Sequence, residues 1–137
     1  VIDRAIVIDA LDPNILDWQQ SLHLAANKED LATDLLKMLV DSFQQELHEI
    51  EQLIELEDYP QLEHVLHRLY GATRYVGTPA LQDVAGGFEQ FVSTLRKERR
   101  KADDAFVQET LNRADELKTV MDQVQQVAQS ILSKYEQ

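Results

Sequence analysis

The chain has 137 residues, which is enough for one domain with a hydrophobic core but too few for two. Its formal net charge of −12 argues against nucleic acid and membrane surfaces as partners, because DNA, RNA and anionic lipid are also negative. There is no cysteine, which excludes disulfides, thiolate zinc sites and a thiol nucleophile, and no run of about 18 apolar residues that could span a membrane.

The chain begins with Val rather than Met and shows no signal peptide, so we expect a cytoplasmic segment of a larger protein. Residues 1–13 lack a clear periodicity, and we interpret them as a linker or an extended arm. Pro13 allows a short amphipathic helix to begin, with apolar residues from Ile15 to Ala26. Its lone Trp18 is expected to anchor one end of the core, with ligand stacking as the alternative.

The next helix is expected to begin at Asn27, whose side chain is a good N-terminal cap. Apolar residues then recur every three or four positions from Leu31 to Leu56, and this stripe includes Met38. Asp58 and Gln61 stand at capping-box spacing, which predicts that another helix begins there.

This central helix is predicted to run to Val76, with Gly77 as a left-handed stop. At 100° per residue its apolar side holds Leu62, Val65, Leu66, Leu69, Thr73 and Val76, and its polar side holds Glu63, His64, His67, Gly71 and Arg74. A helical glycine costs about 0.5–1 kcal/mol relative to alanine. Gly71, one turn beyond the exposed His67, therefore indicates a place where another molecule approaches the backbone closely.

Thr78-Pro79 predicts the start of a further helix, which ends in the basic cluster 96–101. Gly86-Gly87 in its middle indicates close packing against a neighbouring helix, or alternatively room beside the exposed histidine. The basic cluster fits a solvated helix end, with docking to an acidic surface as the alternative. Asp103 or Asp104 should cap the last helix, which extends to Tyr135.

Four long helices with short connections predict an all-α fold: an antiparallel up-down four-helix bundle with an additional short N-terminal helix. Residues 14–137 would form this single domain, and we expect a monomer, since one apolar face per helix suffices for one bundle. No metal is expected, because di-metal bundles use inward Glu-x-x-His pairs and none of the four histidines has Glu three residues earlier.

The segment His67-Arg68-Leu69-Tyr70-Gly71, followed by Gly77, resembles the phosphorylated-helix signature of histidine phosphotransfer (HPt) domains. The continuation from Arg74 to Pro79 is most similar to HPt domains at the C-terminus of BarA/GacS-type hybrid sensor kinases, and the resemblance covers residues 16–132. It implies that His67 accepts a phosphoryl group from a receiver-domain aspartate and passes it to a response-regulator aspartate. Tyr70 stands where the family usually has Lys, so the phosphate-holding role of that Lys is not carried over.

The resemblance also implies supporting roles around His67. Arg68 would partly neutralise the phosphoryl group, Gly71 would admit the receiver, and Arg74 would meet acidic receiver residues. Glu89 would fix the tautomer by accepting a hydrogen bond from Nδ1. The rim contacts with the partner would be His64, Tyr70 and Gly77. No cofactor is expected on this domain, whereas the receiver would supply Mg²⁺ and a lysine.

No ATP-binding motif is present, so we expect no enzymatic activity in isolation, although the parent chain can be a membrane-anchored hybrid sensor histidine kinase. The alternative is a non-catalytic helical adaptor that binds a receiver or another partner through the same face. Labelling of His67 by a phosphorylated receiver would distinguish the two.

Overall fold

The computed structural model describes residues 12–135, and within them all the regular secondary structure is helical. Its elements are α2 (Trp18–Leu24), α3 (Glu29–Glu55), α4 (Tyr59–Ala72), the short 3₁₀ helix η1 (Thr73–Tyr75), α5 (Pro79–Lys97) and α6 (Asp104–Tyr135). The all-α prediction is therefore confirmed. Residues 1–11 of the expected arm lie outside the described part of the chain.

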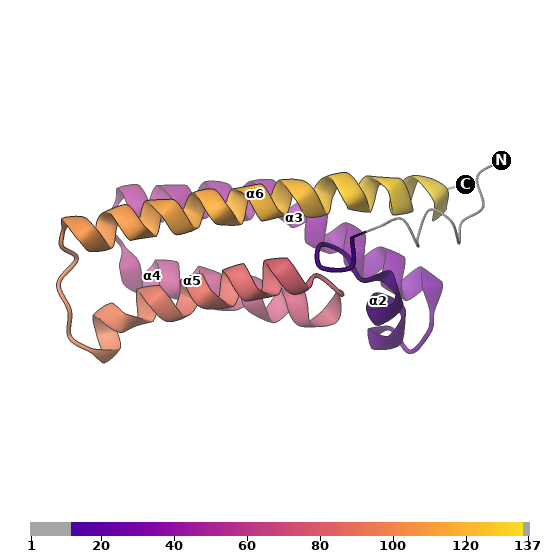
Figure 1. Ribbon diagram of the computed structural model, residues 1–137, viewed down its shortest axis with the longest axis horizontal. Coiled ribbons are helices and arrows are strands. Elements are labelled where there is room, and N and C mark those ends of the chain that lie inside the picture. Colours follow the sequence, from indigo (N-terminus) through magenta and orange to yellow (C-terminus); the bar gives the residue numbers. More distant parts are fainter. Residues whose placement is uncertain (1–11, 136–137) are drawn as a thin grey trace.

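The four long helices form two layers along the long axis of the molecule (Figure 1). The first layer contains α3 and α6, and the second contains α4 and α5. Helix α3 also contacts α4, and α5 also contacts α6, so the four helices surround one core. The shorter α2 packs on α3 at one end, as the sequence predicted. None of these helices combines the length and the apolar character that crossing a bilayer requires.

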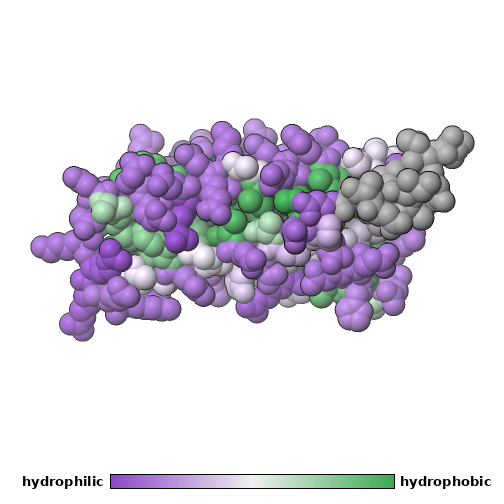
Figure 2. Space-filling model, in the orientation of Figure 1, coloured by the Kyte–Doolittle hydropathy of each residue, from purple (hydrophilic) through white to green (hydrophobic). Residues whose placement is uncertain are grey.

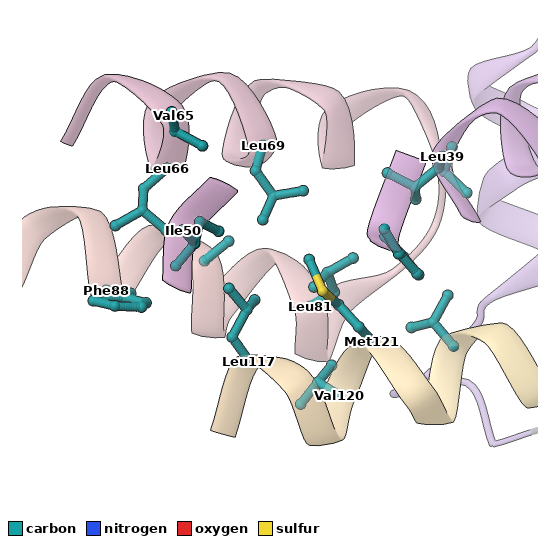
Figure 3. Close-up of a cluster of buried hydrophobic side chains, with 14 of the residues drawn as sticks. Leu39, Ile50, Val65, Leu66, Leu69, Leu81, Phe88, Leu117, Val120 and Met121 are labelled. Atoms are coloured by element: carbon teal, nitrogen blue, oxygen red, sulfur yellow. The ribbon is translucent and has the colours of Figure 1, made fainter. Parts of the chain in front are cut away.

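The core is built from the apolar stripes of all four helices (Figure 3). Leu66 of α4, Leu81 of α5 and Leu117 of α6 are completely buried, as is Ile50 of α3. On the face drawn in Figure 2 most side chains are hydrophilic, and apolar groups gather along the line between the two layers. Burial of the stripe fixes the rotation of each helix, and it therefore decides which residues of α4 face water.

Capping side chains define the start of three helices. Oδ1 of Asp17 accepts a hydrogen bond from Gln20 N at 3.0 Å, and Oδ1 of Asp58 accepts one from Gln61 N at 3.2 Å. Of the two caps considered for α6, Asp103 is the one used, because its Oδ1 accepts from Phe106 N at 2.8 Å. These bonds satisfy amide donors that have no partner within the first helical turn.

Two predictions about α3 were wrong. Asn27 does not cap the helix: it has a φ of 61°, in the left-handed region, and Lys28 occupies the cap position without a side-chain hydrogen bond. The chain needs a tight turn after α2, and asparagine tolerates left-handed backbone better than most residues. Met38 lies outside the core, with 68% of its surface exposed.

The end of α4 also differs from the prediction. The α-helix stops at Ala72, continues as η1, and gives way to extended backbone at Val76, with φ −134° and ψ 139°. Gly77 is not a left-handed stop, since no glycine in the described chain has a positive φ. Instead Gly77 is buried against α2: its carbonyl accepts from Asp17 N at 2.8 Å, and its own N–H donates to Ser21 Oγ at 2.9 Å.

Candidate functional site

His67 lies in the middle of α4 and points to solvent, with 72% of its side chain exposed. Its backbone is held firmly, because Leu66 and Leu69 on either side of it are buried in the core. The ring nitrogen Nδ1 lies 2.7 Å from Oε1 of Glu89, which comes from α5 and is only 20% exposed. An ionised carboxylate can only accept a hydrogen bond, so in the neutral ring Nδ1 carries the proton and Nε2 keeps its lone pair.

The position one turn beyond His67 is free of side-chain cover. A Cβ added to Gly71 would meet nothing within 4 Å. The helical cost of this glycine is therefore not offset by tight packing inside the domain. The bare backbone lies next to the exposed imidazole, which is the arrangement that the sequence predicted.

The side chain of Arg68 is bound by two carboxylates of α3. Its Nη2 donates to both carboxylate oxygens of Glu46 at 3.0 Å, and to Oε2 of Glu49 at 3.1 Å. The hydrogen bond with Glu46, with a smaller effect of Glu49, raises the pKa of Arg68 above its ordinary value. This placement differs from the expectation that Arg68 would face the phosphoryl group, because two carboxylates of α3 already neutralise its charge.

A shallow hollow of about 320 Å³ adjoins the histidine between α4 and α5, and Lys97 also lines it. At its far end Arg96 Nη2 donates to Oε1 of Glu63 at 2.6 Å, and Nε donates to Oε2 at 3.3 Å. The hydrogen bond from Arg96 lowers the pKa of Glu63. Glu63 is therefore a paired carboxylate that ties α4 to the end of α5.

Tyr70 lines the other end of the same hollow and packs against Gly86 of α5. A Cβ on Gly86 would lie 2.9 Å from Cε2 of the ring, closer than real Cβ contacts allow. Gly86 therefore permits close packing, the first of its two predicted roles. On the exposed side, the guanidinium of Arg74 lies over the same ring, 5.0 Å from its centroid.

The remaining predicted rim residues lie in different environments. His64 is exposed one turn before His67, and within residues 12–135 no carboxylate pairs with it. Gly77 is buried under α2, so the structure does not bring it to this surface. Sequence reasoning missed Glu46 and Glu49, although two carboxylates three residues apart on one helix are a recognisable signal for a basic partner.

No group of three or more His, Asp or Glu side chains is placed to hold a metal ion in the described chain. What the geometry defines is a helical bundle with one nucleophilic imidazole, oriented by a carboxylate on the neighbouring helix and exposed beside bare backbone. Phosphoryl transfer suits this arrangement, because a neutral imidazole with a free Nε2 can attack phosphorus.

Comparison with known proteins gives the family. The Hpt domain model matches residues 34–127, more than half of the chain. The chain is 35% identical over 89 residues to the signal transduction histidine-protein kinase BarA of Shigella flexneri, covering 64% of this chain and 10% of that protein. It is 40% identical over 86 residues to the sensor protein GacS of Pseudomonas syringae pv. syringae, covering 63% and 9%.

A solved structure agrees with these matches. The HPT domain from the Hpt sensor hybrid histidine kinase of Shewanella has a TM-score of 0.68 at 32% identity, covering 89% of this chain and 99% of that one. The chain therefore belongs to the Hpt domain family, the histidine phosphotransfer modules of two-component phosphorelays. It spans about a tenth of the length of the curated relatives it matches.

Proposed function

We propose that the domain is a phosphorelay intermediate in which His67 accepts a phosphoryl group from a receiver-domain aspartate and passes it to the aspartate of a response regulator. The main support is the exposed imidazole itself, whose Nδ1 is held 2.7 Å from Glu89 while its Nε2 is free. Membership of the Hpt family supports the same function.

The transfer needs one nucleophile and no cofactor on this domain. The Nε2 lone pair attacks phosphorus, the N–P bond forms, and the P–O bond to the receiver aspartate breaks, which returns that aspartate as a carboxylate. Nδ1 keeps its proton throughout. The ring gains positive charge as the bond forms, and the adjacent Glu89 carboxylate stabilises that charge. Passing the group to the response regulator is the same step in reverse.

The receiver is expected to provide the remaining electrostatic stabilisation, through bound Mg²⁺ and a lysine. The paired state of Arg68 supports this division of labour, since its charge is already offset by Glu46 and Glu49. The open space at Gly71 gives the receiver loop room beside His67. Arg74, exposed on the same side, is expected to meet acidic groups of the receiver.

The test is transfer of labelled phosphate from phosphorylated receiver domains to the purified domain. The parent should gain a phosphate that is stable to base and labile to acid, and His67→Gln should gain none. His48→Gln is the matched control, because it removes another exposed histidine, on α3. Binding of the receiver without labelling of the parent would favour the adaptor alternative, and equal labelling of His67→Gln would exclude His67 as the acceptor.

A further inference from the structure

We propose that Tyr70 is a positioning residue that holds Arg74 as the cation presented to a carboxylate on the receiver. This inference rests on the proposed phosphotransfer function and names the contact that aligns the partner. The structural basis is the Tyr70 ring, which packs against Gly86 of α5 and has the Arg74 guanidinium 5.0 Å from its centroid.

The first observation is the state of the cations around His67. Arg68 is bound by two carboxylates of α3, and Arg96 is bound by Glu63. Arg74 is exposed and, within residues 12–135, contacts the ring of Tyr70 rather than a carboxylate. Its charge is therefore available to a partner, whereas those of Arg68 and Arg96 are already neutralised.

The second observation is the direction of the Arg74 side chain. Side chains of a helix lean toward its N-terminus, so Arg74 reaches back over Tyr70, four residues earlier. This direction leads toward the turn that carries Gly71 and His67. Because Gly71 has no side chain, nothing at that position stands between the guanidinium and a partner that covers the histidine.

The third observation is the packing of the Tyr70 ring. The Tyr70 ring packs so closely on Gly86 that a methyl group there would displace it. The ring is thus held against α5 at Gly86, and the Arg74 guanidinium lies over the ring at 5.0 Å from its centroid. A guanidinium over an aromatic ring makes no hydrogen bond to it, so its N–H groups can bind a carboxylate through two parallel hydrogen bonds. A receiver face that holds Mg²⁺ presents carboxylates, because Mg²⁺ is bound by oxygen ligands of this kind.

The experiment measures initial transfer rates from a phosphorylated receiver over a range of receiver concentrations. Arg74→Gln should raise KM about three- to tenfold, leave the maximal rate within about twofold, and weaken the dependence of KM on salt, as expected for a rim charge. Lys97→Gln is the matched control, since it removes one cation that lines the hollow beside His67 and does not contact Tyr70 in the described part of the chain. Equal effects of Arg74→Gln and Lys97→Gln would overturn the proposal.

Variants of Tyr70 distinguish the positioning of Arg74 by the ring from the effect of the Arg74 charge alone. Tyr70→Phe keeps the ring and should keep the parental KM, whereas Tyr70→Leu should raise KM about two- to fivefold, the range expected for an exposed cation–π contact. Tyr70→Leu should add little to Arg74→Gln, because both changes remove the same contact. Fully additive effects, or a Tyr70→Phe variant as weak as Tyr70→Leu, would contradict a positioning role.

Gly86→Ala tests whether close packing at Gly86 holds the Tyr70 ring in place. Gly87→Ala is its control, because a Cβ at Gly87 would meet only an ordinary contact at 3.5 Å. Gly86→Ala should raise KM in the manner of Tyr70→Leu, and Gly87→Ala should not. If the parent is labelled at His67 but Arg74→Gln transfers like the parent, this inference fails and the proposed function stands. If the parent is not labelled at all, both fail.

Discussion

Nδ1 of His67 lies 2.7 Å from Oε1 of Glu89, although the two residues are 22 positions apart in the sequence. The pair joins α4 to α5 and places a partly buried carboxylate against one nitrogen of an exposed ring. In the neutral ring this contact leaves Nε2 as the nitrogen with the free lone pair.

Glu89→Ala should slow phosphoryl transfer to His67 by roughly 10- to 100-fold, because a hydrogen bond to a charged group contributes about 1.5–3 kcal/mol. Glu89→Gln should fall between the parent and Glu89→Ala, since an amide oxygen still accepts from Nδ1 but carries no charge. Rapid-quench labelling measures the rates. Transfer at the parental rate in Glu89→Ala would mean that the carboxylate does not orient the ring.

Gly71→Ala should separate stability from function. The added methyl group meets no neighbour, so the helix should gain about 0.5–1 kcal/mol in unfolding free energy. Transfer from the receiver should nevertheless slow, because the methyl group fills the space left for the partner. Urea melts and labelling rates on the same preparation check both effects, and a variant that gains stability without losing rate would refute the idea of close approach.

Gly77→Ala should have the opposite effect on stability. A Cβ at Gly77 would run into the backbone carbonyl oxygen of Asp17, which is fixed in the first turn of α2 by the hydrogen bond from Ser21 N at 3.0 Å. Overpacking of this kind costs about 1–3 kcal/mol. Chemical denaturation should show this loss. A neutral result would show that α2 can shift away from η1 without cost.

Leu69→Ala and His67→Gln test the assignment of the two faces of α4. Leu69 is 3% exposed and packs in the core of Figure 3, so its truncation should cost about 2–5 kcal/mol. His67→Gln exchanges one exposed polar side chain for another and should change stability by less than about 0.5 kcal/mol. Similar destabilisation by both changes in urea melts would contradict the observed rotation of the helix.

The ion pair of Glu63 with Arg96 should make the free energy of unfolding depend on pH. The Arg96 hydrogen bond lowers the pKa of Glu63 below the ordinary value of 4.5, so the folded state favours the ionised carboxylate. Its contribution to stability is present above that ordinary value and is lost as pH falls through the lowered pKa. The difference in unfolding free energy between the parent and Glu63→Gln should therefore be largest near neutral pH and shrink in acid. A constant difference across this range would contradict the pairing.

Much of this molecule was determined by local sequence. Helix starts at Asp58 and Asp103 follow from side chains that cap their own helices, and the exposure of His67 follows from apolar periodicity along α4. Such features depend on residues only a few positions apart, so they can be read without knowing the fold. The contact of Glu89 with His67 was expected only through resemblance to a family.

Tertiary structure alone decided which groups meet across helices. It paired Arg68 with Glu46 and Glu49, packed Gly86 against Tyr70, and buried Gly77 against Asp17 instead of leaving it at the end of a helix. The physical reason is that these contacts depend on the axial register of one helix against another. Register is set by the packing of the whole core, and no short stretch of sequence carries that information.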